Sequence, residues 1–155
     1  MTTRPTVHIP HLGGIDVSYQ KPDYPHDANK PTLVLLHSFM TTSDLYSPQF
    51  EDEEITKAAN LIAIDLLGHG QTRINDKSGG GAGENFTYWD SAIMIIQAMQ
   101  ALGVEKYFVL GTSQGGFVAV RMALLAPKKV VGSFPLLPPH LPHCLYWIYG
   151  KIRPM

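Results

Sequence analysis

The 155-residue chain has few charges, one cysteine and no long apolar run. Its 12 basic side chains against 13 acidic ones leave a formal net charge of -1, so there is no basic field that would collect nucleic acid or anionic lipid. Cys144 has no second cysteine for an internal disulfide, and residues 1–6 lack the apolar stretch of a secretory signal. No apolar run approaches the ~18 residues of a membrane span. These absences predict an intracellular, cytoplasmic protein that binds a small organic molecule, with no nucleic acid and no membrane among its partners.

What the sequence does contain is enough apolar residues, 45% of the chain, for one buried core. Residues 15–19 alternate apolar and polar side chains, which is typical of a half-buried edge strand. Residues 33–36 and 61–65 are largely apolar runs, as in parallel strands covered on both faces. Residues 47–59 between them have the length of a crossover helix. This part of the chain therefore predicts a strand–helix–strand unit.

The next part of the chain repeats this alternation. Residues 66–85 predict a loop because of their many glycines, and Thr87 and Asp90 then form the pattern of a helix capping box. Apolar residues at helical spacing follow until Gly103, which predicts a second crossover helix. The elements expected after it are a buried strand, a helix and a further strand, at residues 107–110, 117–126 and 130–134. This order predicts an α/β fold whose open, mostly parallel sheet has helices on both faces.

The composition changes at Pro135, because four prolines lie between residues 135 and 142. No helix or central strand tolerates that density of proline. The apolar stretch 145–149 that follows has no later element to pack against. We therefore expect two regions, an α/β region at residues 1–134 and an atypical, Pro-rich tail at residues 135–155.

The turn at residues 111–115 (GTSQG) fits the pattern G-x-S-x-G, which places a nucleophilic serine between a strand and a helix. Ser113 is the candidate nucleophile. Gly111 and Gly115 leave room for the backbone that crosses at this turn. The turn also aims the Gln114 N–H and the N-terminus of the following helix at the position of a tetrahedral oxyanion. The alternative is a serine that only caps the helix after a glycine-rich turn.

Two further loops follow predicted strands, at residues 37–40 (HSFM) and residues 65–72 (DLLGHGQT). Together with the turn at Ser113, and in this order and spacing, they resemble the N-terminal part of the α/β-hydrolase superfamily. The resemblance runs from about residue 15 to residue 131. It implies an α/β-hydrolase fold that is truncated after about the sixth strand.

The resemblance also implies roles for the residues of these loops. The Phe39 backbone N–H becomes the second oxyanion donor beside Gln114. Ser38 stands where the family usually has glycine, at backbone angles that cost a serine more. His37 is expected to brace its loop. The positions expected to shape the second loop beneath the site are Gly68, His69 and Gly70, with Thr72 where the family carries serine.

At a finer level, residues 48–50, 110–116 and 121–127 are similar to hydrolases of fungal secondary-metabolite clusters, including those of host-selective toxin pathways. This similarity implies hydrolysis of an ester or thioester of a small polyketide-like acid. Full-length relatives of that kind can be peroxisomal. This chain ends in IRPM, which is no peroxisomal address.

The family places an acid and then a histidine after the nucleophile, but this chain has no aspartate or glutamate after Ser113. The acid and the base are therefore unknown. His140 and His143, the only later histidines, have no nearby carboxylate, so we expect neither a metal nor a cofactor. The change at Pro135 fits a truncated gene product, an altered splice or a frame-shifted end. Missing strands would expose a sheet edge, which invites self-association.

Three functions remain open at this stage. The first is a serine hydrolase of the esterase or thioesterase kind, which the motifs favour. The second is a catalytically inactive remnant or a small-molecule binding module, which the absent acid favours. The third is epoxide or haloalkane opening, but those reactions use a carboxylate nucleophile at the position of Ser113.

Overall fold

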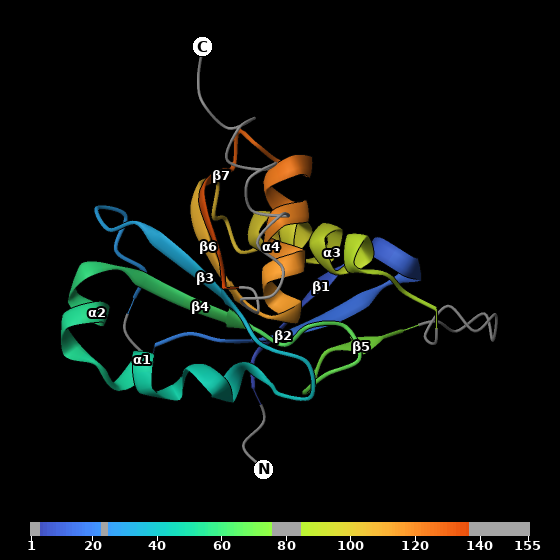
Figure 1. Ribbon diagram of the computed structural model, residues 1–155, viewed down its shortest axis with the longest axis horizontal. Coiled ribbons are helices and arrows are strands. Elements are labelled where there is room, and N and C mark those ends of the chain that lie inside the picture. Colours follow the sequence, from blue (N-terminus) through green and yellow to red (C-terminus); the bar gives the residue numbers. More distant parts are fainter. Residues whose placement is uncertain (1–3, 23–24, 76–84, 137–155) are drawn as a thin grey trace.

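The computed structural model describes residues 4–22, 25–75 and 85–136. These residues form a seven-stranded mixed sheet of order β1-β2-β4-β3-β6-β7, with β5 paired to β2 (Figure 1). The strands are β1 (Thr6–Ile9), β2 (Ile15–Gln20), β3 (Thr32–Leu36), β4 (Asn60–Ile64), β5 (Arg73–Ile74), β6 (Tyr107–Thr112) and β7 (Val130–Leu136). The order places the earliest strands at one edge of the sheet and the strands around Ser113 toward the other.

Four of these strands, β4, β3, β6 and β7, run parallel to one another, whereas β1, β2 and β5 are antiparallel to their neighbours. The apolar runs predicted as doubly covered strands are β3 and β4, and Val34, Leu36 and Ile64 on them are fully buried. Because all parallel strands end at the same edge, the loops that follow β3, β4 and β6 meet there.

The described helical segments are η1 (His11–Gly13), η2 (Ser43–Tyr46), α1 (Ser47–Glu51), α2 (Glu53–Ala58), α3 (Tyr88–Ala101) and α4 (Gln114–Leu125). The capping box predicted at the start of α3 is confirmed, since the Thr87 side chain accepts from the Trp89 and Asp90 N–H groups and Asp90 accepts from the Thr87 N–H. Gly103 follows the helix with a φ of 74°, which a glycine adopts at no steric cost. None of the described helices is long and apolar enough to cross a membrane.

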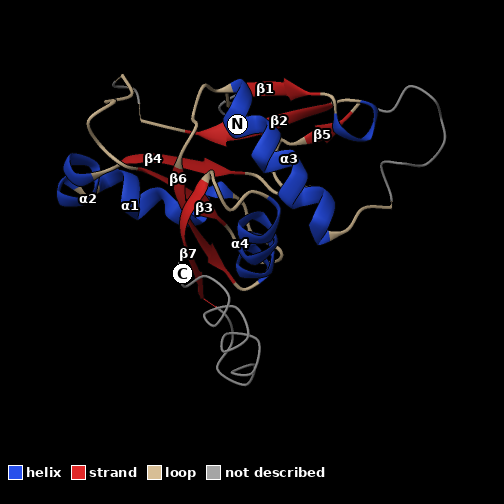
Figure 2. Cartoon of the chain, turned by 90° about the horizontal axis from the view of Figure 1, so that it is seen from above, coloured by secondary structure: helices blue, strands red, loops and turns tan. Residues whose placement is uncertain are grey.

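Helices lie on both faces of the sheet, as predicted. Figures 1 and 2 show α3 and α4 on one side and α1 and α2 on the other. The main core lies under α3 and α4 and joins buried side chains of those helices to the sheet. A much smaller core of Leu35, Tyr46 and Ala63 lies on the side of α1 and α2.

Several boundaries differ from the prediction. The single helix expected at residues 47–59 is two short helices, because Asp52 has an extended backbone and its side chain caps α2 by accepting from the Glu54 and Ile55 N–H groups. β5 lies inside the predicted loop, and β1 was not foreseen. β7 continues through Pro135 to Leu136, which an edge strand of the described sheet tolerates because a proline there loses no ladder bond.

Candidate active site

The chain turns sharply at Ser113, between β6 and α4. Ser113 has φ 51° and ψ -110°, and only two other described non-glycine residues, Leu12 and Met40, have a positive φ. A left-handed backbone costs a residue with a Cβ about 1–2 kcal/mol. Ser113 therefore has a strained backbone at the point where β6 ends and α4 begins.

The two glycines that flank Ser113 lie where no side chain fits. A Cβ on Gly111 would lie 2.1 Å from the Gly115 carbonyl oxygen, and a Cβ on Gly115 would lie 2.1 Å from the carbonyl oxygen of Leu36. These contacts are with backbone atoms, which cannot move aside as a flexible side chain does. Glycine at position 111 thus lets β6 approach the start of α4, and glycine at position 115 lets α4 approach the end of β3.

Some backbone N–H groups around the turn donate to a protein acceptor, and others do not. The Gly116 and Phe117 N–H groups donate to the Ser113 carbonyl oxygen, and the Gly115 N–H donates to the His37 carbonyl oxygen at 3.1 Å. Within the described residues, no acceptor is recorded for the Gln114 or Phe39 N–H. The two N–H groups named as oxyanion donors are therefore unoccupied by protein acceptors in that part of the chain.

His37 joins the loops that follow β3 and β4. Its buried ring accepts the Leu66 N–H on Nε2 at 3.0 Å, so the proton lies on Nδ1, which donates to the Ser38 carbonyl oxygen at 2.8 Å. Burial lowers the pKa of His37 below its ordinary value. A neutral ring with both nitrogens engaged holds two loops together.

The loop after His37 differs from the prediction made for Ser38. Its left-handed residue is Met40, with φ 59°, and not Ser38. The expectation that serine is strained where relatives have glycine is therefore wrong, because this loop makes its turn two residues later. Phe39 and Met40 are 63% and 82% exposed. The Phe39 ring contacts His69 edge-on, with 5.9 Å between ring centroids.

Glycines also shape the loop after β4. Gly70 has φ 54°, and a Cβ there would lie 2.2 Å from the Asp65 carboxylate. Gly68 has φ 77°, and a Cβ would lie 2.8 Å from the ring of Phe86. His69 between them pairs through Nδ1 with the Leu67 carbonyl oxygen at 2.9 Å, and its ring lies 5.1 Å from that of His37.

Asp65 is the buried centre of this loop; the resemblance implied that it shapes the loop, but the sequence did not reveal its contacts. Its carboxylate accepts from the Ser43 N–H at 2.8 Å, from the Gln71 N–H at 2.9 Å and from the Arg4 guanidinium at 3.2 Å. Burial by itself would raise the pKa of Asp65, but the hydrogen bonds outweigh it and the pKa lies below the ordinary value. An ionised Asp65 thus joins three segments far apart in sequence.

Tyr46 was also missed by sequence reasoning, since no local pattern marks it. Its buried hydroxyl donates to the Leu36 carbonyl oxygen at 2.8 Å and lies 3.1 Å from the Thr112 Oγ1. Burial raises the pKa of Tyr46, so it remains a donor. Tyr46 therefore ties the end of β3 to the residue before Ser113.

No partner for the Ser113 hydroxyl is recorded among residues 4–22, 25–75 and 85–136. The pair of His8 and Asp16, 2.8 Å apart, lies on β1 and β2, and four strand spacings of about 19 Å in total separate β1 from β6. The described part of the chain also holds no group of three potential metal ligands. His140 and His143 lie outside the described residues.

Three loops thus meet at the carboxyl edge of the parallel strands, around a G-x-S-x-G turn. A family model for the α/β hydrolase fold matches residues 31–139, more than half of the chain. This chain belongs to the α/β hydrolase family. An uncharacterized carboxylesterase of Bacillus subtilis is 29% identical over 114 residues, 74% of this chain and 35% of the relative. A pimeloyl-[acyl-carrier protein] methyl ester esterase of Nitrosomonas europaea is 30% identical over 106 residues, 66% of this chain and 35% of the relative.

Solved structures agree with this α/β hydrolase assignment. A CIB-like hydrolase from Thermoplasma acidophilum superposes with a TM-score of 0.67 at 22% identity, over 96% of this chain and 69% of that one. At that identity the likeness shows the fold alone. The chain spans about a third of the length of the two curated relatives.

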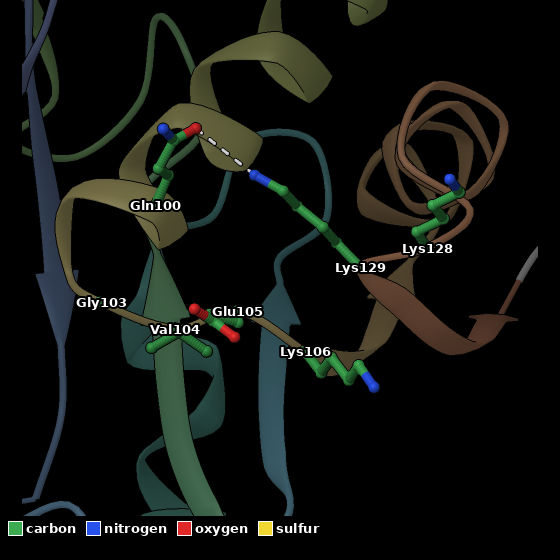
Figure 3. Close-up of a pocket in the computed structure, with 7 residues that line it drawn as sticks. All are labelled: Gln100, Gly103, Val104, Glu105, Lys106, Lys128 and Lys129. Carbon is green, nitrogen blue, oxygen red and sulfur yellow. Dashed lines mark hydrogen bonds between the residues drawn. The ribbon is translucent and has the colours of Figure 1, made fainter.

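A separate cavity of about 430 Å³ lies away from the turn of this α/β hydrolase, at the amino ends of β6 and β7 (Figure 3). The Lys129 ammonium donates to the Gln100 side chain there at 3.3 Å, while Lys106 and Lys128 extend outward. β6 is six residues long, so about 17 Å separates this cavity from Ser113. The cavity is no part of the candidate site.

The strain at Ser113 can be measured by comparing two substitutions. Ser113→Ala keeps a Cβ on the left-handed backbone, whereas Ser113→Gly removes it. We expect the glycine variant to have the higher free energy of unfolding, by roughly 1 kcal/mol. Urea unfolding of both variants measures the difference.

The same pair at Ser133 on β7 provides the control, because Ser133 has no positive φ. There glycine should be less stable than alanine by about 0.5–1 kcal/mol. A glycine variant that is the less stable one at both positions would show that the turn at Ser113 is unstrained.

Proposed function

We propose that this chain carries the nucleophile half of a serine hydrolase of the esterase or thioesterase type. Ser113 is its nucleophile, and the Phe39 and Gln114 N–H groups are its oxyanion donors. The observation that carries the proposal is the left-handed Ser113 between two glycines that admit no side chain. The esterases among its relatives support an ester as substrate.

The proposed reaction begins with attack of the Ser113 Oγ on the carbonyl carbon of the ester. The π electrons of the carbonyl move to its oxygen, which accepts the two backbone N–H groups. As this intermediate collapses, the bond to the leaving oxygen or sulfur breaks, and that atom takes up the proton that Ser113 gave to the base, so an alcohol or thiol departs and an acyl-serine remains. Water then hydrolyses the acyl-serine to the free acid and restores the Ser113 hydroxyl. The Ser113 proton needs a base, and we propose that the acid and the histidine belong to a part of the hydrolase that this chain does not contain.

The substrate proposed from the finer resemblance is an ester or thioester of a small polyketide-like acid, in secondary metabolism. This part of the proposal depends on the sequence similarity of residues 48–50, 110–116 and 121–127. That neither nucleic acid nor a membrane is a partner of this chain remains a prediction from its composition. The cytoplasmic location also remains a prediction. Epoxide opening is not favoured, because the turn carries a serine and not a carboxylate.

The second candidate function is a non-catalytic binding module. It is favoured by the lack of any acidic residue after Ser113 and by the unpartnered Ser113 hydroxyl in the described part of the chain. Without a base, what remains is oxyanion stabilisation and binding, worth about 10³-fold over water in a serine protease. Turnover by this chain alone is accordingly expected to be slow.

A fluorophosphonate probe separates the two functions. Because the chain supplies no base, we expect the folded chain to be labelled slowly. Ser113→Ala should lose the label and Ser133→Ala should keep it, because the proposed oxyanion donors serve Ser113 and not Ser133. Labelling is followed by intact-mass measurement, with circular dichroism to verify folding. A folded chain that takes no label favours the binding module for this polypeptide.

A further inference from the structure

The Ser38 carbonyl oxygen, in the loop after β3, accepts three hydrogen bonds. The Thr41 hydroxyl and the His37 Nδ1–H each donate to it at 2.8 Å, and the Thr41 N–H donates at 3.3 Å. The Thr41 Oγ1 also lies 3.3 Å from His37 Nδ1, so the two side chains approach the oxygen together. A carbonyl oxygen has two lone pairs, so three donors leave this group little freedom to turn.

This oxygen belongs to the same peptide unit as the Phe39 N–H. The described residues contain no cis peptide bond, and a trans peptide holds its C=O and N–H in one plane on opposite sides of the chain. Whatever fixes the direction of the Ser38 C=O therefore fixes the direction of the Phe39 N–H. No acceptor among the described residues takes that N–H, so within them the unit is held from its carbonyl end.

Residues 38–41 form a β-turn, which the bond from the Thr41 N–H to the Ser38 carbonyl oxygen closes. Its third residue, Met40, has φ 59°, whereas Phe39 is not among the described non-glycine residues with a positive φ. That combination is typical of a type II turn. The N–H of the second residue takes no part in closing such a turn. The turn therefore leaves the Phe39 N–H available to a ligand.

We propose that Thr41 is a positioning residue of this α/β hydrolase: its hydroxyl holds the Ser38–Phe39 peptide so that the Phe39 N–H faces the oxyanion formed at Ser113. The inference rests on the proposed function, in which that N–H is one of two oxyanion donors. Such donors stabilise the intermediate because they are aligned before the charge develops and need not reorient. Thr41 supplies this alignment through the peptide and does not itself touch the substrate.

The Thr41 hydroxyl is the one of the three donors that can be removed by itself. His37 also accepts the Leu66 N–H, so changing it would disturb a second loop. The Thr41 N–H is lost only in a proline variant. Thr41→Val keeps the shape of the side chain and removes the hydroxyl, whereas Thr41→Ser keeps the hydroxyl and removes a methyl group.

The first measurement is the rate at which a fluorophosphonate labels Ser113, with circular dichroism to verify folding. We expect Thr41→Val to be labelled about 10-fold more slowly than the parent, which is less than the roughly 10²–10³-fold cost of losing an oxyanion donor, because the Phe39 N–H remains but is less well aligned. Thr41→Ala, which also lacks the hydroxyl, should behave as Thr41→Val does. Thr41→Ser should restore the parent rate.

Thr42→Val is the matched control. It removes the neighbouring hydroxyl of the same loop, which donates to the Asp44 carboxylate at 3.0 Å. This variant should be labelled at the parent rate.

The second measurement does not depend on chemistry at Ser113. NMR relaxation dispersion of the backbone amides reports motion on the microsecond-to-millisecond timescale. We expect no dispersion at the Phe39 amide in the parent, in Thr41→Ser or in Thr42→Val. Dispersion should arise in Thr41→Val, because the Ser38–Phe39 peptide is then held by fewer donors.

The two measurements separate this inference from the proposed function. A folded parent that takes no label contradicts the proposed function, and the Phe39 amide then decides by itself whether Thr41 holds the peptide. The inference is overturned if the Phe39 amide shows no dispersion in Thr41→Val, or if a labelled parent and Thr41→Val react equally fast. It is also overturned if Thr42→Val slows labelling as much as Thr41→Val, or if Thr41→Ser does not restore the rate.

Discussion

Asp65→Asn should lower the free energy of unfolding by about 3 kcal/mol, although it changes a single atom of the side chain. The carboxylate is fully buried, and it accepts from two backbone N–H groups and from Arg4. An amide would point its own N–H₂ at one of these donors and would remove the buried one of the two carboxylates that pair with the Arg4 guanidinium, which would keep only the exposed Asp44. Removing one partner of a buried pair typically costs 3–5 kcal/mol.

The Asp65 contribution should also depend on pH in a defined direction. The pKa of Asp65 in the folded chain lies below its ordinary value, so folding favours the ionised form. Its stabilisation is therefore complete above the unfolded pKa of about 4 and is lost as the pH falls through the folded pKa. The difference between the parent and Asp65→Asn, measured by urea unfolding, should shrink below about pH 4.

Asp44→Asn is the control for this prediction. Asp44 pairs with the same Arg4, but its side chain is 67% exposed. Exposed ion pairs contribute about 0–1 kcal/mol, so the Asp44 variant should lose less than the Asp65 variant at neutral pH. Equal losses would mean that the buried hydrogen bonds of Asp65 contribute little.

Gly115→Ala is the second substitution with a large expected effect. It should lower the free energy of unfolding, although helix propensity alone would raise it. Alanine in the first turn of α4 would gain about 1 kcal/mol over glycine by propensity alone. The added Cβ, however, would lie 2.1 Å from the Leu36 carbonyl oxygen and 2.8 Å from that of His37. Overpacking costs about 3 kcal/mol when a rigid group must move. We expect a net loss of about 2 kcal/mol in urea unfolding.

Gly103→Ala separates this clash from backbone strain. Gly103 has φ 74° and no atom within 4 Å of its Cβ position, so alanine there meets strain without a clash. We expect that variant to lose about 1 kcal/mol. If Gly115→Ala were the more stable of the two variants, the conclusion that α4 lies too close to the end of β3 for a side chain at position 115 would be contradicted.

The order of strands and helices was predictable because its signals are local. Apolar runs specified β3 and β4, and the spacing of Thr87 and Asp90 specified the start of α3. The turn at Ser113 was equally visible, since its two glycines lie two residues on either side. The single helix expected at residues 47–59 was wrong because an acidic residue such as Asp52 suits the interior of a first helical turn as well as the cap between two helices.

By itself the sequence determined the α/β order, the place of Ser113 and the absence of an acid after it, because short-range periodicity and composition carry these features. Only the tertiary structure decided that Asp65 joins Arg4, Ser43 and Gln71, and that Tyr46 ties β3 to the residue before Ser113. Arg4 and Tyr46 reach partners 61 and 66 residues away. Such contacts depend on which strands become neighbours, and that choice is made by the packing of the whole sheet and not by any short stretch of sequence.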